Sequence, residues 1–311
     1  MQDKLVTLIG GGGFLGRYAA QHLLQQGARV RFAQRDPRAA EFLRPLGGLG
    51  QTQFVATDIR KPESLARALQ GSDAVVNLVG ILKGDFQAIQ AEGARNVAVA
   101  AATVGATSLV HVSAIGADSR SASQYGRTKG EGDDAVRAAF PTATILRPSI
   151  VFGREDQFVN RFAGMIASAP VVPVLRAATR FQPVYVDDVA RAIAASLADP
   201  ARFGGKMIEL GGPDVLSMGA LIRWIADAIG RHPTIIELPD SMGGLIAMLG
   251  FLPGAPITQD QWRMLQSDNV VAPDAEHFSG FGIVPTPLAS VAPTWLVRYR
   301  RNGRFSSDAA A

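Results

Sequence analysis

The sequence predicts an α/β protein with a doubly wound parallel sheet, covered by helices on both faces, and a smaller lobe in its second half. From residue 4 to about 150, short apolar runs rich in valine and isoleucine alternate with longer helix-like segments, as in parallel βαβ units. A glycine-rich turn follows the first apolar run. After Gly153 the alternation ends and proline-rich loops begin.

The elements of the first half are read from this alternation. Apolar runs predict strands at 5–9, 28–33, 53–56, 74–78, 108–112 and 144–147. Segments with helical spacing predict helices at 14–26, 62–70, 86–104 and 124–139. We therefore expect a dinucleotide-binding domain of the Rossmann type over residues 1–150.

The second half carries weaker signals. They predict one strand at 181–186 and helices at 187–198, from 217 or 218 to 229, at 258–267 and at 288–298. We expect residues 181–210 to return to the first domain and residues 151–311 to form mainly a substrate or interaction lobe. Asp187 and Asp188 begin the helix at 187–198 and are expected to cap it rather than to do acid–base work or bind Mg²⁺.

Composition excludes several classes of protein. With 311 residues, 47% of them apolar and 19% charged, the chain can bury a core, which excludes disorder and coiled coil. Cysteine is absent, so disulfides and thiolate chemistry are excluded. The four histidines are too scattered for a metal motif, and none is expected. The net charge of +4 forms no basic stripe, so nucleic acid is not an expected partner.

The glycine-rich turn predicts a nucleotide site. It satisfies both the GxGxxG and the GxxGxxG spacings directly before the first helix. Glycine lets the backbone approach a diphosphate, and the helix N-terminus offers unpaired N–H groups. The expected cofactor-binding residues here are Gly10, Gly12, Gly13, Phe14, Leu15 and Gly16.

The choice of cofactor should be made at the end of the second strand. NAD-binding proteins usually place a carboxylate there, whereas this chain has Ala33, Gln34 and Arg35. A guanidinium suits a phosphate, so Arg35 favours NADP(H), and NAD(H) stays an alternative. Asp36 is interpreted as a helix cap before Pro37, with a contact to the ribose as the second interpretation.

Tyr125 and Lys129 are candidate catalytic residues. Their spacing of four puts both on one face of the predicted helix. Ser113 follows the preceding strand, at the edge where open α/β sheets bind ligands. In the functional interpretation Tyr125 transfers a proton, Lys129 lowers the pKa of Tyr125 and holds a ribose, and Ser113 bonds the oxyanion. The alternative is a solvent-facing pair.

These motifs resemble the extended or atypical short-chain dehydrogenases/reductases. The resemblance implies an adenine contact at Asp58 and Ile59, and cofactor contacts at Leu78, Val79, Gly80, Tyr125, Lys129 and Pro148. Gln90 stands where active members often carry a catalytic asparagine. The predicted active-site helix holds Gly126, Gly130 and Gly132, which indicates either close backbone approach or marginal stability.

The strings NLVGIL, HVSAIGAD, LRPSIVFG and RFQPVYVDDVA are similar to the nucleotide-binding accessory subunit of respiratory complex I and its bacterial relatives. This resemblance implies tightly held NADPH and a structural, assembly or quinone-linked role, in a respiratory or quinone-biosynthesis complex. The alternative is an active NADP-dependent oxidoreductase that reduces a carbonyl or enone through Ser113, Tyr125 and Lys129. A sugar-nucleotide epimerase is a weaker alternative.

The expected location is the cytoplasm, with peripheral contact at the inner face of a membrane as an alternative. The most apolar stretch, LIAMLGFL at 245–252, is far shorter than the roughly 20 residues of a spanning helix. It could only touch a bilayer. An arginine cluster at 298–304 could rest on anionic lipid, or could simply complement a helix dipole.

Overall fold

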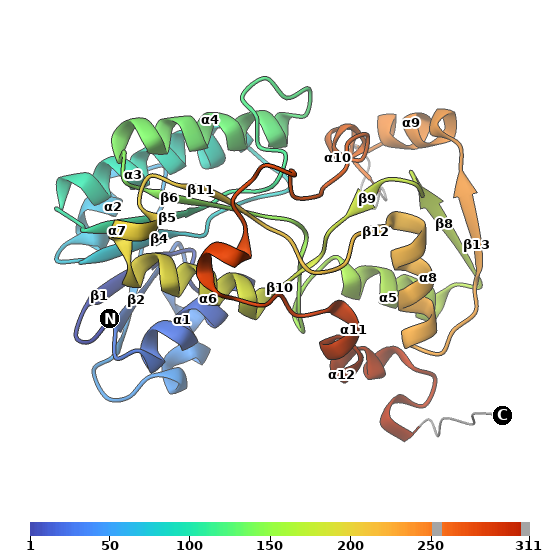
Figure 1. The fold of residues 1–311 in the computed structure, drawn as a ribbon, viewed down its shortest axis with the longest axis horizontal. Helices are drawn as coiled ribbons and strands as arrows, with labels where there is room; N and C mark the ends of the chain where they lie inside the picture. Colours follow the sequence, from blue (N-terminus) through green and yellow to red (C-terminus); the bar gives the residue numbers. More distant parts are fainter. Residues whose placement is uncertain (251–256, 306–311) are drawn as a thin grey trace. The chain divides into compact units, whose positions relative to one another are not determined.

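The computed structural model describes residues 1–250 and 257–305. The chain forms two compact units (Figure 1). The first unit comprises Met1–Pro148, Val186–Leu210 and Val271–Val284, and the second comprises Ser149–Tyr185, Gly211–Val270 and Pro285–Ala311. The assignment of the second half to substrate or partner binding stays a prediction.

The first unit is built on one seven-stranded parallel sheet with the order β11-β6-β5-β4-β1-β2-β3. Its strands are β1 (Leu5–Ile9), β2 (Arg29–Gln34), β3 (Thr52–Ala56), β4 (Ala74–Asn77), β5 (Ser108–Val112), β6 (Thr144–Pro148) and β11 (Met207–Leu210). The six predicted strands are confirmed within a residue or so at each end. The order reverses direction at β1, where doubly wound sheets bind their ligands.

Helices cover both faces of this sheet, as Figure 1 shows. On one face α2 (Pro62–Leu69), α3 (Glu92–Thr103) and α4 (Gln124–Ala139) lie side by side. On the other, α1 (Phe14–Gln25) packs against α6 (Val186–Ala198). The predicted helix at 86–104 begins with a π-helical turn, η2 (Gln87–Ala91), before α3. The doubly wound prediction is confirmed.

The core between the sheet and the α2–α4 face is made of small and branched side chains. Ala94, Val97, Ala98 and Ala101 of α3 are almost fully buried against the residues of β4 and β5. Alanine lets the helix axis approach the sheet closely and is the best helix former. The alanine-rich segment therefore forms a helix that sits directly on the strands carrying the site.

The second unit is a collection of short elements. Parallel strands β8 (Val171–Leu175) and β13 (Thr234–Leu238) form one pair, β7 (Val151–Phe152) and β10 (Val184–Tyr185) a second, and antiparallel β9 (Arg180–Phe181) and β12 (Leu216–Ser217) a third. Its helices are α5 (Val159–Ser168), α8 (Met218–Ala228), α9 (Asp240–Met248), α10 (Gln259–Met264), α11 (Leu288–Val291) and α12 (Pro293–Leu296).

Some predictions for the second half are wrong. The single strand at 181–186 is split into β9 and β10, with Gln182 and Pro183 between them. The helix at 288–298 is broken at Pro293, which lacks the N–H that a continuous helix requires. Helix α6 begins at Val186, so Asp187 and the buried Asp188 lie in its first turn rather than at its cap.

The predicted helix at 258–267 is shorter than expected, ending at Met264, and it opens with a capping box between Thr258 and Gln261. Helix α9 ends at Met248, within the apolar stretch at 245–252. Residues 251 and 252 of this stretch lie outside the described residues. In the described parts of the chain, every helix is too short or too polar to span a lipid bilayer.

Candidate functional site

The glycine turn after β1 forms an anion cradle at the start of α1. Gly10 has a φ of +79°, a conformation that L side chains rarely adopt. A Cβ on Gly16 would lie 2.3 Å from the carbonyl oxygen of Gly11, so only glycine permits this packing. Gly13 is the N-cap of α1, and no side chain caps the helix. Its first N–H groups, those of Phe14, Leu15 and Gly16, therefore suit a diphosphate.

The loops after β1, β2 and β4 meet at this edge. The Gly10 N–H donates to the Ala33 carbonyl at 2.8 Å, and the Leu78 N–H donates to the Ile9 carbonyl at 3.0 Å. A Cβ on Gly10 would lie 3.1 Å from Cγ2 of Val79. Residues that the sequence places far apart, at 10 and at 78–79, are thus brought into contact.

Gln34 closes the end of β2, a role that the sequence analysis missed. Its Oε1 accepts the Gly12 N–H at 2.9 Å, and its Nε2 donates to the Asp36 carbonyl at 2.6 Å. The Gly12 amide is therefore engaged within the protein. Arg35 is exposed directly beyond the strand. Asp36 accepts the Arg38 N–H at 3.1 Å and caps the following 3-10 helix, so the capping interpretation of Asp36 is confirmed.

Asp58 and Ile59 lie beyond β3 in different environments. The Asp58 carboxylate accepts hydrogen bonds from Nη2 of Arg60 at 2.6 Å and from its backbone N–H at 3.0 Å. These bonds from Arg60 lower the pKa of Asp58 to about 2. Ile59 is buried, with its side chain against Gly93 and its carbonyl accepting from Nδ2 of Asn96. Asp58 is the more accessible member of this predicted adenine pair.

The three predicted catalytic residues lie on α4 and at the carboxyl end of β5. Lys129 Nζ donates to the Val112 carbonyl at 3.1 Å and would lie 3.4 Å from a Cβ on Gly80. The Ser113 hydroxyl is buried, has no partner at hydrogen-bond distance within the described residues, and helps to lower the pKa of Asp133. Partly buried Tyr125 meets the Phe86 ring edge-on, with 6.2 Å between centroids. Lys129 and Ser113 thus belong to one strand edge, beside the loop after β4.

Pro148, the remaining predicted cofactor contact, ends β6 next to Ser113. Its carbonyl accepts the Ile115 N–H at 3.0 Å, and the Leu146 carbonyl accepts the Ser113 N–H at 2.8 Å. Pro148 is buried. These bonds continue the pairing of β5 and β6 past Val112 and hold Ser113 in place at the end of the sheet.

The pKa of Tyr125 differs from the value that the sequence analysis predicts, and the pKa of Lys129 is also shifted. Burial and the charge of Asp133 raise the pKa of Tyr125 to about 12. Burial lowers the pKa of Lys129 to about 8. The predicted lowering of the Tyr125 pKa is therefore not seen, because desolvation of the phenol and the negative charge of Asp133 both raise this pKa. At neutral pH the phenol is protonated and Lys129 is charged.

Gln90 and the helix glycines join η2 to α4. The buried Gln90 side chain donates to Oγ1 of Thr128 at 2.9 Å. A Cβ on Gly132 would lie 2.3 Å from the Gln90 carbonyl oxygen, and one on Gly130 would lie 2.2 Å from the Ser119 nitrogen. Close backbone approach therefore explains these glycines, and Gln90 acts here as a packing residue.

Several charged groups outside this edge form ion pairs. His22 Nε2 lies 2.7 Å from Asp187, and Asp188 lies 3.4 Å from Arg191. Within the described residues no cluster of His, Asp and Glu could hold a metal ion. In the second unit Arg180 pairs with Asp268 at 2.8 Å and Arg176 with Asp240.

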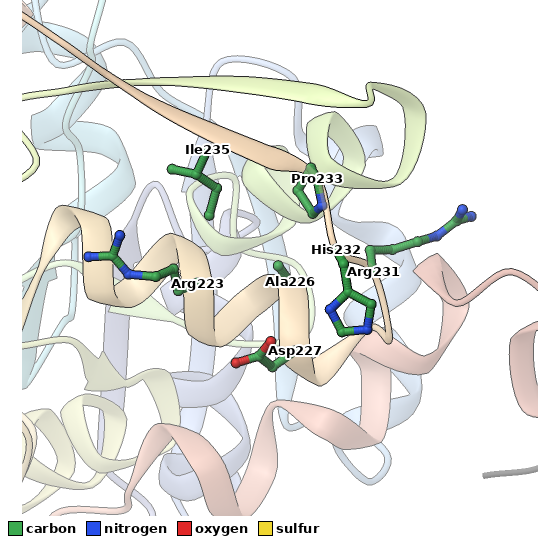
Figure 2. A pocket seen from close by; sticks show the side chains of 7 residues that line it. All are labelled: Arg223, Ala226, Asp227, Arg231, His232, Pro233 and Ile235. Carbon is green, nitrogen blue, oxygen red and sulfur yellow. The ribbon is translucent and has the colours of Figure 1, made fainter. Parts of the chain in front are cut away.

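The second unit has a hollow of about 270 Å³ between the end of α8 and β13 (Figure 2). Its lining includes Arg223, Asp227 and His232, and Figure 2 shows the Arg231 guanidinium turned away from it. Arg223 Nη1 lies 3.5 Å from a carboxylate oxygen of Glu237, so its positive charge is already compensated by an ion pair. None of the predicted site residues lines this hollow.

Comparisons with known proteins agree with this geometry. The model of the NAD-dependent epimerase/dehydratase family matches residues 6–211. The chain is 33% identical to the mitochondrial NADH dehydrogenase (ubiquinone) 1 alpha subcomplex subunit 9 of Mus musculus, over 98% of this chain and 82% of that protein. It is 32% identical to ceramide reductase of Caulobacter vibrioides, over 76% of this chain and 74% of that protein.

A solved structure shares the fold. The NADPH-dependent quinone oxidoreductase of Escherichia coli, complexed with NADPH, superposes with a TM-score of 0.76 at 20% identity, covering 94% of this chain and 99% of that one. At this identity the likeness speaks only to the fold. It agrees with a Rossmann-type sheet whose switch point lies at β1.

Proposed function

This chain belongs to the NAD-dependent epimerase/dehydratase family, and on that premise we propose that it holds NADPH in its first unit and serves as a nucleotide-binding accessory component of a respiratory or quinone-linked complex. It is an NAD(P)-binding protein of the short-chain dehydrogenase/reductase type. The observation that carries the accessory role is the 33% identity to the mouse subunit over 98% of this chain.

The residues at the sheet edge fit a dinucleotide. The uncapped N-terminus of α1 suits the diphosphate, and glycine at positions 10 and 16 keeps that cradle free of side chains. Lys129, held between the Val112 carbonyl and Gly80, has two further N–H donors for ribose hydroxyls. Bound NADPH would supply a hydride. The unpartnered Ser113 hydroxyl is available to a carbonyl oxygen beside it.

The preference for NADPH rests on Arg35. It is exposed beyond β2, where a carboxylate would otherwise accept the 2′-hydroxyl of NADH, and Gln34 and Asp36 are both occupied by backbone groups. We expect wild type to bind NADPH more tightly than NADH, and Arg35→Ala to remove roughly tenfold of the NADPH affinity, or about 1.4 kcal/mol. Arg95→Ala, at an exposed position on α3, is the control.

Dissociation constants of both cofactors test this preference by titration. Equal affinity for NADPH and NADH in wild type would contradict the role of Arg35. An NADPH dissociation constant that is the same in Arg35→Ala and Arg95→Ala would also contradict it. Mass spectrometry of the ligand released from the purified, denatured protein gives an independent measurement, with NADP(H) as the expected species.

The accessory role predicts slow or absent turnover. A stopped-flow panel should follow oxidation of bound NADPH by soluble quinones, aldehydes, ketones and long-chain keto lipids. The expected result is that NADPH raises the melting temperature while its absorbance at 340 nm persists with every acceptor. Rapid oxidation by one acceptor would contradict a purely accessory role.

An active reductase is the second candidate, and the meeting of Lys129, Ser113 and the loop after β4 at one strand edge favours it. Reduction of a carbonyl requires a protonated acid. Tyr125 carries its proton at neutral pH, but a pKa of about 12 makes it a weaker acid than an ordinary phenol. The ceramide reductase relative makes a lipid carbonyl a reasonable member of the panel. In this reaction Tyr125 Oη would donate its proton to the carbonyl oxygen, and bound NADPH would supply the hydride for the carbon, so that the product is an alcohol.

The two candidates are separated by Tyr125→Phe. If any acceptor is reduced, this variant should lose at least a hundredfold in kcat, in keeping with the usual contribution of a positioned acid, while its NADPH affinity stays near that of wild type. Tyr299→Phe, in the second unit, is the matched control. Turnover that survives Tyr125→Phe would remove Tyr125 from the catalytic role.

A further inference from the structure

A buried polar chain lies beneath the proposed cofactor site and is not part of any assignment above. Asp133 of α4 is fully buried and accepts hydrogen bonds from Arg147 of β6, at 2.8 Å from Nη2 and 3.0 Å from Nε. On its other side, Asp133 Oδ1 lies 3.4 Å from Nε2 of His111 on β5. A carboxylate at this depth persists only with such partners.

The hydrogen bonds of Asn77 determine the tautomer of His111. Asn77 Oδ1 accepts the Val79 N–H at 3.2 Å, so its Nδ2 is the amide nitrogen that donates to His111 Nδ1 at 3.1 Å. Because Nδ1 accepts, the ring proton is on Nε2, which faces Asp133. Burial lowers the pKa of His111, so the ring is neutral. This row of polar side chains therefore runs from Asn77 of β4 through His111 of β5 to Asp133 of α4 and Arg147 of β6.

Asp133 also lies in register with the two candidate catalytic residues of its helix. Tyr125, Lys129 and Asp133 are spaced by four, which puts them along one face of α4. Lys129 is buried, and its ammonium ends against the carbonyl of Val112, the residue that follows His111 in β5. The same strand thus meets α4 at Lys129 and at Asp133.

Burial and the charge of Asp133 have opposite effects on the Lys129 ammonium, since burial lowers its pKa and Asp133 raises it. Asp133 stabilises the positive charge. His111 of β5 and Arg147 of β6 also face Asp133, and the pKa of Asp133 is lowered because their influence outweighs burial. Tyr125 is protonated and neutral. Asp133 is therefore the negative charge that balances two cations, Lys129 and Arg147, in a buried space.

We propose that Asp133 is a positioning residue of the cofactor site: clamped by Arg147 and facing His111, it anchors α4 to β5 and β6 and fixes the Lys129 ammonium beside Val112 and Gly80. This inference rests on the proposed function, because it assigns Lys129 to a bound ribose. Asp133 itself is fully buried. It acts through the place and the charge of Lys129.

Titration of Lys129 tests the proposal without any cofactor. The chain has only five lysines, so lysine side-chain NMR signals can be resolved, and the signal missing from Lys129→Met identifies this residue. In wild type Lys129 should titrate at a pKa of about 8. In Asp133→Asn this pKa should fall, since the balancing negative charge is gone. Asp134→Asn, at the exposed neighbouring position, is the control and should leave it unchanged.

A structural role alone would lower the melting temperature of Asp133→Asn without moving the Lys129 titration, and that result would overturn the proposal. Because Asp133→Asn leaves the partly buried Arg147 without its carboxylate partner, it could fail to fold. The double variant Asp133→Asn/Arg147→Gln removes both charges and should fold, again with a lowered Lys129 pKa. Asp133→Glu keeps the charge and should move the titration back toward wild type.

The NADPH dissociation constant separates this proposal from the proposed function. Asp133→Asn, or the double variant if the single one fails to fold, should raise it roughly tenfold over Asp134→Asn, which is about 1.4 kcal/mol. If wild type does not bind NADPH, the proposed function fails and the NMR titration still decides the role of Asp133. If wild type binds NADPH and both aspartate variants bind it equally, the positioning role of Asp133 is wrong.

Discussion

Replacing Gly16 by alanine should disrupt the cofactor cradle by a purely steric effect. The new Cβ would lie 2.3 Å from the Gly11 carbonyl oxygen and 2.7 Å from the Gly11 Cα. Both atoms belong to backbone, which cannot rotate away as a side chain does. The turn and the first residues of α1 must therefore move apart, and with them the N–H groups that would meet the diphosphate.

Two opposing effects set the stability of the cofactor-free Gly16→Ala variant. Alanine favours a helix over glycine by about 1 kcal/mol, and overpacking costs about 1–3 kcal/mol. The net loss in unfolding free energy is at most about 2 kcal/mol. The larger effect should appear with ligand. At one hundredfold the wild-type Kd, NADPH stabilises wild type by about 2.7 kcal/mol, and a tenfold weaker variant by about 1.4 kcal/mol.

Thermal unfolding with and without NADPH measures this difference. The ligand-induced rise in Tm should be roughly 3–5 °C smaller in Gly16→Ala than in wild type, for a unit of this size. Gly280→Ala is the matched control, because a Cβ at Gly280 meets nothing within 4 Å. If Gly16→Ala binds NADPH within twofold of wild type, the assignment of the diphosphate to this turn is refuted.

Three further predictions follow from other residues. The pKa of Lys129 is about 8 in the free protein, and an anionic cofactor favours its charged form, so NADPH binding should weaken about tenfold from pH 7 to pH 9. Calorimetry should show proton uptake on binding at the higher pH, and Lys129→Met should abolish that uptake. An NADPH affinity of wild type that does not change with pH would contradict this prediction. Gly130→Ala should lower Tm although it adds a helix former, since its Cβ would lie 2.2 Å from the Ser119 nitrogen; an unchanged or higher Tm would show that this loop yields. Asp156→Asn should lower the unfolding free energy of the second unit by about 1–3 kcal/mol in urea, since the buried carboxylate accepts the N–H groups of Gly153 and Val159 at 3.1 and 2.6 Å. A loss of unfolding free energy no larger than that of the exposed Asp134→Asn variant would contradict this role of Asp156.

Local patterns explain why much of the first unit could be predicted. The central strands of the parallel sheet are rich in apolar residues. The glycine turn has a spacing with few structural alternatives, and α4 has the predicted bounds because the Ser123 hydroxyl caps it by accepting the Gly126 N–H. The shorter β11 was missed, because four residues of mixed polarity carry no periodic signal. Proline-interrupted elements of the second unit were missed or misplaced for the same reason.

The sequence alone determined the βαβ alternation, the glycine turn and the Tyr125–Lys129 spacing, because each depends on residues a few positions apart. Only the tertiary structure decided that Gln34 closes the turn, that Gln90 packs on α4, and that Asp133 lies between His111 and Arg147. Burial also reversed the expected shift in the Tyr125 pKa. The desolvation of a side chain and its long-range hydrogen bonds depend on which strands and helices, distant in the sequence, pack together. A local sequence pattern contains no information about this packing.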